Sequence, residues 1–118
     1  MFELMQRLVA FKYSSKLNHW KTNSYAKHLL FDRLQEDIDD IVDGIAEKYF
    51  MANKKQDELK PELLKAEFID KDLVKLCKDI KAHLEKIVKD GKVDEGIVSL
   101  LSGIEEAIDE KLALLTLE

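Results

Sequence analysis

Apolar residues recur every three or four positions along almost the whole chain, which is the spacing of amphipathic α-helices. Four such runs predict helices over roughly 2–21, 25–53, 71–89 and 95–116. The longest run carries its apolar stripe at Phe31, Leu34, Ile38, Ile41, Ile45 and Tyr49. Four helices of this kind predict an all-α protein with one four-helix-bundle domain over 1–118.

Residues at the ends of these runs support the same division. Ser24, Asp70 and Asp94 stand where the second, third and fourth helices would start, and their side chains are good N-caps. Asp90-Gly91 predicts the end of the third helix, with the glycine in a left-handed C-cap. The 118 residues include only four Gly and one Pro, so helix breakers are few.

Composition and charge narrow the class of protein. Apolar residues make up 46% of the chain and charged residues 36%, which is typical of a folded, soluble domain. The net charge is −5 and no basic tail is present, so we expect no strong nucleic-acid binding. No signal peptide and no membrane-spanning run is found, and the single Cys fits a reducing compartment. We therefore expect a cytoplasmic protein without a membrane partner.

The residues that suggest chemistry are His19, His28, Asp32, Asp43 and Glu47. Two imidazoles and three carboxylates are ligands that iron, manganese and zinc accept. In one continuous helix over 25–53, His28 and Asp43 would lie about 22 Å apart along the axis, which is too far for one site. The set is therefore either part of a solvated helix face, or two copies of the chain build the site together.

The acidic residues of the second run would form a stripe opposite its apolar stripe. A solvated face explains such a stripe, but Tyr25 and Phe50 fall on it as well, which indicates a covered surface. Two copies packed antiparallel about a two-fold axis can place His28 against Glu47 of the partner copy. In that register Asp32 faces Asp43, and Tyr25 faces Phe50. An isologous dimer would then hold two identical sites, each with ligands from both chains.

The residues between 21 and 25 predict a short turn that folds the first helix back and brings His19 beside His28. One imidazole from each helix, with Asp43 and Glu47 of the partner copy, would complete a set of metal ligands. Asp32 would be a further ligand, or would orient an imidazole by hydrogen bonding.

The segment 19–49, HWKTNSYAKHLLFDRLQEDIDDIVDGIAEKY, resembles the Dps family of mini-ferritins, within the ferritin-like superfamily. The family pattern has a His-Trp near the end of one helix, then a His with an Asp four residues later on the next. An Asp and a Glu four residues apart follow, and then a basic residue. The matching residues here are His19, Trp20, His28, Asp32, Asp43, Glu47 and Lys48.

This resemblance implies a ferritin-like four-helix bundle with a ferroxidase centre shared between two subunits. His19, His28 and Asp32 would come from one chain, and Asp43 and Glu47 from the other. The resemblance also implies that ferrous iron is oxidised by peroxide or dioxygen, and that a hollow homo-oligomeric cage stores the ferric product. Iron, or another first-row divalent metal, is the expected ion. The basic tail that often carries DNA binding in the family is absent, so DNA protection is not carried over.

Two other functions stay open at this point. One is a helical interaction protein without metal. The other is a magnesium-dependent all-α nucleotide pyrophosphohydrolase, for which Glu36-x-x-Asp39 and Glu67-x-x-Asp70 would be the acidic elements.

Three further residues have simpler interpretations. Trp20 either shields a metal site or anchors the core. Cys77 lies in an apolar stripe, where a small buried side chain is expected, and His83 has a structural or surface role without a suggested carboxylate partner.

Overall fold

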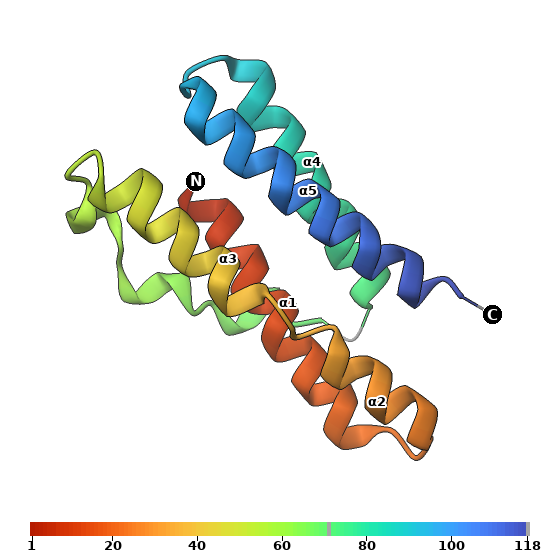
Figure 1. Ribbon diagram of the computed structural model, residues 1–118. Helices are drawn as coiled ribbons and strands as arrows, with labels where there is room; N and C mark the ends of the chain where they lie inside the picture. The colour runs from red at the N-terminus through yellow and green to blue at the C-terminus, as the bar shows by residue number, and fades with distance from the viewer. Residues whose placement is uncertain (71, 118) are drawn as a thin grey trace.

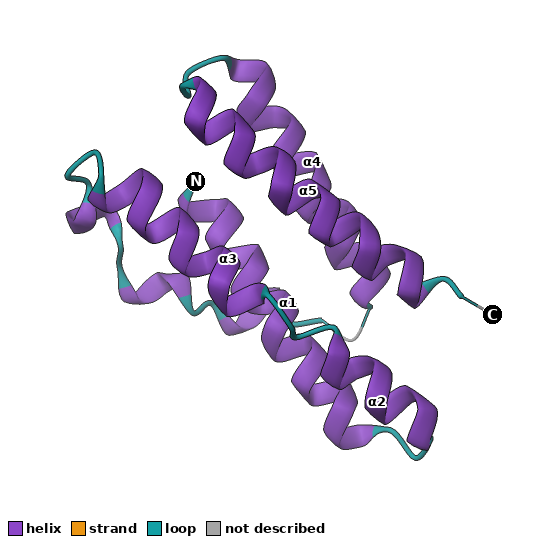
Figure 2. Cartoon of the chain, in the orientation of Figure 1, coloured by secondary structure: helices purple, strands orange, loops and turns teal. Residues whose placement is uncertain are grey.

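The computed structural model describes residues 1–70 and 72–117, and within these ranges the chain consists of helices joined by turns and loops, without a strand (Figure 2). The long helical elements are α1 (Phe2–Lys21), α2 (Tyr25–Arg33), α3 (Ile38–Ile45), the π-helical segment η1 (Ala46–Met51), α4 (Leu73–Asp90) and α5 (Glu95–Leu115). Three short 3-10 turns, η2 (Gln56–Glu58), η3 (Pro61–Leu63) and η4 (Ala66–Phe68), lie in the connection to α4.

Helix α1 organises the molecule, which measures 45 × 27 × 20 Å (Figure 1). The chain turns back after α1, so that α2 lies along the C-terminal half of α1 and α3 along its N-terminal half. The connection with the 3-10 turns also packs against α1 and leads to α4. Helix α4 packs on α1 and forms an antiparallel hairpin with α5.

The core lies between α1, α3, α4 and α5, where the apolar stripes of these helices meet. Its fully buried side chains include Leu4, Leu8, Phe11, Leu34, Ile38, Ile45, Phe50, Cys77, Ile80, Leu84, Leu101 and Ile108. Helix α2 contributes no buried residue, so it is held mainly by its contact with α1. No helix among the described residues is both long and apolar enough to cross a membrane.

The predicted single helix over 25–53 is wrong, because the structure divides it into α2, α3 and η1. The break comes between Leu34 and Asp37, where Asp37 takes a left-handed conformation with φ 71°. Asp is among the few non-glycine residues that adopt this region readily, and a single left-handed residue ends the helical path. Figure 2 shows the break as a loop between α2 and α3.

The π-helical segment η1 changes the predicted position of Phe50, which the sequence places on the acidic face. A π-helix has a wider turn than an α-helix, as the bond from the Ala52 N–H to the Glu47 carbonyl at 3.1 Å illustrates. The wider turn changes the direction of the following side chains. Phe50 is 1% exposed and lies edge-on to Tyr49, with ring centroids 5.0 Å apart, so it is not on the acidic face. The predicted contact between Tyr25 and Phe50 of a partner copy is therefore wrong.

The other helix boundaries are close to the predicted ones. The first helix covers Phe2–Lys21, and the Ser24 side chain caps α2 by accepting from the Lys27 N–H at 3.3 Å. Asp94 caps α5 by accepting from the Ile97 N–H at 2.9 Å, and Gly91 ends α4 with φ 65°.

The start of α4 differs from the prediction. Asp72, rather than Asp70, is the N-cap and accepts from the Lys75 N–H at 3.1 Å. Asp70 instead accepts from the Asp72 N–H at 2.9 Å, which fixes the turn before the helix. Lys71, the first residue of the predicted helix, lies outside the described residues.

Candidate metal centre

His19 and His28 lie in contact across the α1–α2 turn. Helix α1 ends at Lys21, the Thr22 N–H donates to the Asn18 carbonyl at 3.0 Å, and α2 starts at Tyr25. This tight turn stacks the two imidazoles, with centroids 3.7 Å apart and an interplanar angle of 23°. The predicted proximity of the two histidines is confirmed.

Two reciprocal hydrogen bonds fix the orientation of the stacked rings. Nδ1 of His19 lies 2.8 Å from the His28 carbonyl oxygen, and Nδ1 of His28 lies 2.9 Å from the His19 carbonyl oxygen. A carbonyl oxygen only accepts, so each Nδ1 carries the proton and donates it. In the neutral rings the two Nε2 atoms are then unprotonated, and each has a lone pair available for a metal ion.

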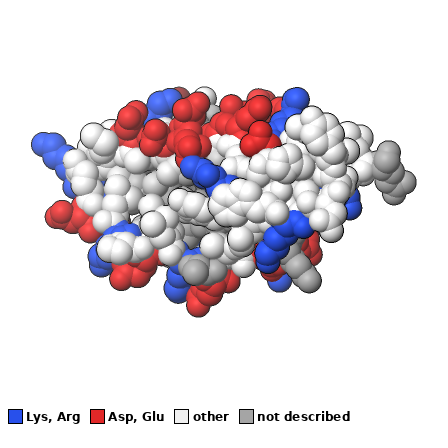
Figure 3. All heavy atoms as spheres, turned by 90° about the horizontal axis from the view of Figure 1, so that it is seen from below, with Lys and Arg blue, Asp and Glu red and all other residues white. Residues whose placement is uncertain are grey.

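The carboxylates of Asp32, Asp43 and Glu47 are the other predicted ligands. All three residues are exposed, and within residues 1–70 and 72–117 their carboxylates make no ion pair or hydrogen bond. Figure 3 shows one face of the molecule, on which Asp and Glu side chains gather along one long edge, with Lys or Arg side chains among them and near the middle of the face. Unpaired carboxylates on an acidic surface attract cations.

Two other acidic residues near the start of α3 are engaged within the chain. Asp39 accepts from Lys12 Nζ at 2.6 Å, which links α3 to α1. Asp37 lies 4.0 Å from Nζ of Lys111, a residue of α5 that is only 5% exposed. These pairs fix the start of α3 against α1 and α5. Asp37 and Asp39 therefore have a structural role, unlike the three predicted ligands, whose carboxylates have no partner among the described residues.

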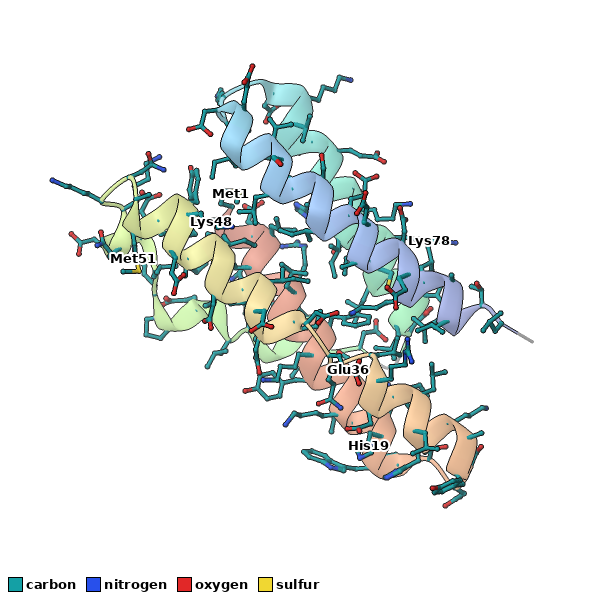
Figure 4. All side chains as sticks on the ribbon, viewed as in Figure 1. Met1, His19, Glu36, Lys48, Met51 and Lys78 are labelled. Atoms are coloured by element: carbon teal, nitrogen blue, oxygen red, sulfur yellow. The ribbon has the colours of Figure 1, made fainter. Side chains whose placement is uncertain are left out.

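One copy of the chain does not gather the five predicted ligands. The His pair lies at the α1–α2 turn, and Asp43 and Glu47 lie beyond the break. In Figure 4, His19 is near that turn, whereas Lys48, the residue after Glu47, is near the opposite end of the molecule. No group of three or more His, Cys, Asp or Glu side chains within the described part of one chain could hold a metal ion.

Large aromatic side chains flank the His pair on the surface. Trp20 is 67% exposed and Tyr25 is 77% exposed, although both are large enough to favour burial. Trp20 is therefore not a core anchor in the single chain. Leu29, on the next turn of α2, is also exposed. These exposed side chains, close to the histidines in sequence, leave apolar surface that a partner could cover.

The remaining residues of chemical interest lie elsewhere. Cys77 is fully buried, and burial raises the pKa of its thiol to about 12, in agreement with the expected small core side chain. His83 does have a carboxylate neighbour, since its Nε2 lies 3.8 Å from Asp79 Oδ1, so that expectation is wrong. Burial, and secondarily Arg7, lowers the pKa of His83.

The acidic residues of the pyrophosphohydrolase alternative either pair with other groups of the chain or lie outside a helix. Asp39 pairs with Lys12 and Glu67 pairs with Lys65 at 3.0 Å, while Asp70 shapes the turn before α4. Glu36 lies in the break and not on a helix. These side chains do not form the facing helical pairs that a magnesium site of this class requires.

Comparison with known proteins identifies a family. A model described as a family of unknown function, DUF5856, matches residues 19–115, which include all five predicted ligands. Because the match covers most of the chain, the protein belongs to this family. No curated protein and no solved structure matches the chain.

Proposed function

We propose that this member of the DUF5856 family binds ferrous iron as a substrate and oxidises it at sites shared between two copies of the chain. The fold would be a ferritin-like four-helix bundle, in which the broken α2–α3 unit takes the place of one long helix. The observation that carries this proposal is the stacked pair of His19 and His28, whose Nδ1 atoms both donate to backbone carbonyls.

The hydrogen bonds of the His pair are those of a metal-binding imidazole. Ligating histidines usually donate their second ring N–H to a carbonyl or carboxylate, which fixes the tautomer and orients the ring. Here both rings make this hydrogen bond without a bound ion, so the imidazoles need little reorientation when a metal binds. Imidazole nitrogen combined with carboxylate oxygen suits iron and other first-row divalent ions.

The missing ligands would come from a second copy. In an antiparallel two-fold dimer, Asp43 and Glu47 of one chain face Asp32 and His28 of the other, and the symmetry creates two identical sites. The exposed carboxylates of these residues lack partners among the described residues, and they supply the charge that a cation needs. Trp20 and Tyr25 would be covered by the same contact.

The chemistry requires an external oxidant, which is peroxide or dioxygen. With peroxide, two ferrous ions each lose one electron, and the peroxide takes up these electrons and two protons to give two waters. The imidazoles and carboxylates hold the ions and favour the ferric state, because anionic oxygen ligands stabilise the higher charge. A dimer, or a larger cage built from dimers, in the cytoplasm would store or remove the ferric product.

Substitution of His28 tests the proposal. We expect His28→Ala to slow ferrous oxidation by about tenfold or more, because the substitution removes one imidazole ligand and the ring that stacks on His19. His83→Ala is the matched control, since His83 lies on α4 away from the turn. Oxidation by His28→Ala at the wild-type rate, measured from the absorbance of the ferric product, would contradict the proposal.

A second candidate function is favoured by the exposed aromatic residues alone. Trp20 and Tyr25 could serve a helical interaction protein that uses no metal. Anaerobic calorimetry separates the two functions. The interaction protein would self-associate or bind a partner without heat from added ferrous iron, whereas the proposed ferroxidase would bind iron with a heat that His28→Ala abolishes.

A further inference from the structure

Residues 16–33, which we call the arm, form a helical hairpin that contributes no buried residue to the core. The arm consists of the C-terminal end of α1, the turn at 22–24 and α2. Figure 1 shows the tip of the arm projecting beyond the α4–α5 hairpin. The exposed large apolar side chains of the arm are Leu17, Trp20, Tyr25 and Leu29. Large apolar side chains that gather on one exposed element indicate a surface that packs against a partner.

The arm is positively charged in an otherwise acidic chain. Residues 4–31 contain five Lys and Arg residues and no Asp or Glu, although the net charge of the whole chain is −5. Two of the five pair with carboxylates of α3 and α4. The side chains of the other three, all on the arm, make no ion pair with any described residue: Lys16, Lys21 and Lys27. The arm therefore presents unpaired positive charge beside exposed apolar surface.

A groove of about 390 Å³ lies between α3 and α5. Half-buried Ile41 and Leu100 supply apolar surface to this groove, and Gly44 and Gly103 line it without a side chain. A Cβ added at Gly103 would meet no atom within 4 Å, so this part of the groove is open. Ligand pockets in proteins start at about 300 Å³, so the groove is large enough for an aromatic side chain.

The helices that border the groove are strongly acidic. Residues 34–47 contain six Asp and Glu residues, residues 94–110 contain another six, and neither segment contains Lys or Arg. Asp40 lines the groove, and its carboxylate has no ion-pair partner within residues 1–70 and 72–117. Lys48 also lines the groove, just after the first acidic segment. The charge of the groove borders is therefore opposite to that of the arm.

We propose that the arm of one copy of the chain docks in the α3–α5 groove of a second copy, with Trp20 inserted between the two helices. In a two-fold pair each chain supplies one arm and one groove, so two identical contacts form. Trp20 follows His19 in the chain, and Asp43 lies one turn after Asp40, so docking would bring the His pair towards Asp43 of the second copy. This interface deepens the proposed function, which rests on contact between copies, but the docking itself requires no iron.

Charge favours this occupant over a second arm. Two arms packed together would bring their unpaired lysines close to one another, and like charges that face each other across an interface cost free energy. The groove of a second copy offers apolar surface and the opposite charge at once. The contact should therefore weaken as salt is added, because the lysines and the groove borders lie at the surface.

Trp20 is the only tryptophan of the chain, so its fluorescence reports the docking directly. Its side chain is 67% exposed in the single chain and would be covered in the groove. With a chelator present, we raise the protein concentration from about 0.1 to about 100 μM, which spans weak and stable contacts. We expect the emission to shift to shorter wavelength and acrylamide quenching to fall, while analytical ultracentrifugation shows monomers becoming dimers.

A bulky residue in the groove tests where the arm docks. Gly103→Phe fills the groove from within the same chain, and the open space around a Cβ at this position lets the fold accept it. We expect this variant to weaken the association by about tenfold or more and to keep Trp20 in solvent. Ser102→Phe is the matched control, because Ser102 is the exposed neighbour on α5 and does not line the groove. Circular dichroism checks that both variants fold.

Charge reversal tests the complementarity of the two surfaces. Lys21→Glu and Asp40→Lys should each weaken the association by about threefold or more, because each places like charges across the contact. The chain that carries both substitutions restores opposite charges, so its association should return towards the wild-type value. Losses that simply add in the double variant would overturn the docking of the arm beside Asp40.

The remaining failures separate the interface from the proposed function. A wild-type chain that stays monomeric up to about 100 μM without iron would overturn the arm–groove contact. Dimers that form equally well with Gly103→Phe would overturn it as well, because another surface would then hold the copies together. Ferrous oxidation is measured separately on the same samples. Dimers that are disrupted by Gly103→Phe but oxidise no iron would support the interface and contradict the proposed function.

Discussion

At the scale of single residues, the imidazoles of His19 and His28 depend on each other's backbone. Each ring donates to the carbonyl of the other residue, so the loss of either side chain also frees a backbone acceptor. The proximity of the two rings could be predicted from the short turn between the helices. The reciprocal bonds could not, because they depend on the direction of two carbonyl groups that no residue pattern records.

Protonation of this pair gives the first test. Nδ1 of each ring already carries a proton, so any further proton goes to Nε2 and removes the lone pair that would bind metal. Protons and the metal ion therefore compete for the same Nε2 lone pairs, so Zn²⁺ affinity should fall as the pH is lowered. Calorimetric titration at several pH values checks the trend. A constant affinity would mean that carboxylates alone hold the ion.

The thiol of Cys77 provides a test that is independent of metal. Burial raises its pKa from 9.0 to about 12, so at pH 8 far less thiolate is present in the folded chain than in the unfolded one. Alkylation by iodoacetamide should therefore be slower by about a hundredfold or more in native protein than in denaturant. Above pH 9.0 the unfolded chain ionises this thiol and the folded chain does not, so Cys77 lowers stability as the pH rises. Rapid alkylation of native protein would show that α4 does not pack as described.

At the scale of helices, boundaries set by local chemistry were predictable. Ser24, Gly91 and Asp94 act within one turn of their own position, and each is found where the sequence places it. The break after Arg33 was not predictable, because residues 34–37 contain no helix breaker and the broken form is held by lysines of α1 and α5. Those pairs depend on tertiary packing, which outweighs local helix propensity here.

The cap of α5 offers a direct measurement at this scale. Asp94 Oδ1 accepts from the Ile97 N–H at 2.9 Å, so Asp94→Ala should lower the free energy of unfolding by about 1 kcal/mol. Asp90→Ala is the control, because Asp90 is an exposed carboxylate near the C-terminal end of α4, where a negative charge is unfavourable. Urea denaturation should show a clear loss for the first variant and none for the second. Equal effects would mean that the cap contributes nothing specific.

At the scale of the whole molecule, helix α2 and the residues beside it expose apolar surface that the rest of the chain does not cover. This helix buries no residue, and Trp20 and Tyr25 lie mostly in solvent beside the His pair. The sequence predicted an all-helical chain and most of the apolar faces that form the core. It could not predict the break between α2 and α3, because no helix breaker marks it. The predicted ligands are separated in one chain because α2 and α3 lie along opposite halves of α1.

The central claim is that two copies share each site, and complementation between two inactive variants tests it most directly. His28→Ala and Asp43→Ala are first shown to be inactive separately in ferrous oxidation. They are then unfolded, mixed in equal amounts and refolded, and heterodimers are verified with distinct affinity tags. In a heterodimer one site carries both lesions, and the other combines His28 of one chain with Asp43 of the other and is intact.

Random pairing makes half of the dimers mixed, so about a quarter of the wild-type oxidation rate should return. Each variant unfolded and refolded alone is the control, and neither should recover activity. A site contained within one chain predicts no recovery from the mixture. Verified heterodimers that remain inactive would contradict the shared site formed by His28 and Asp43.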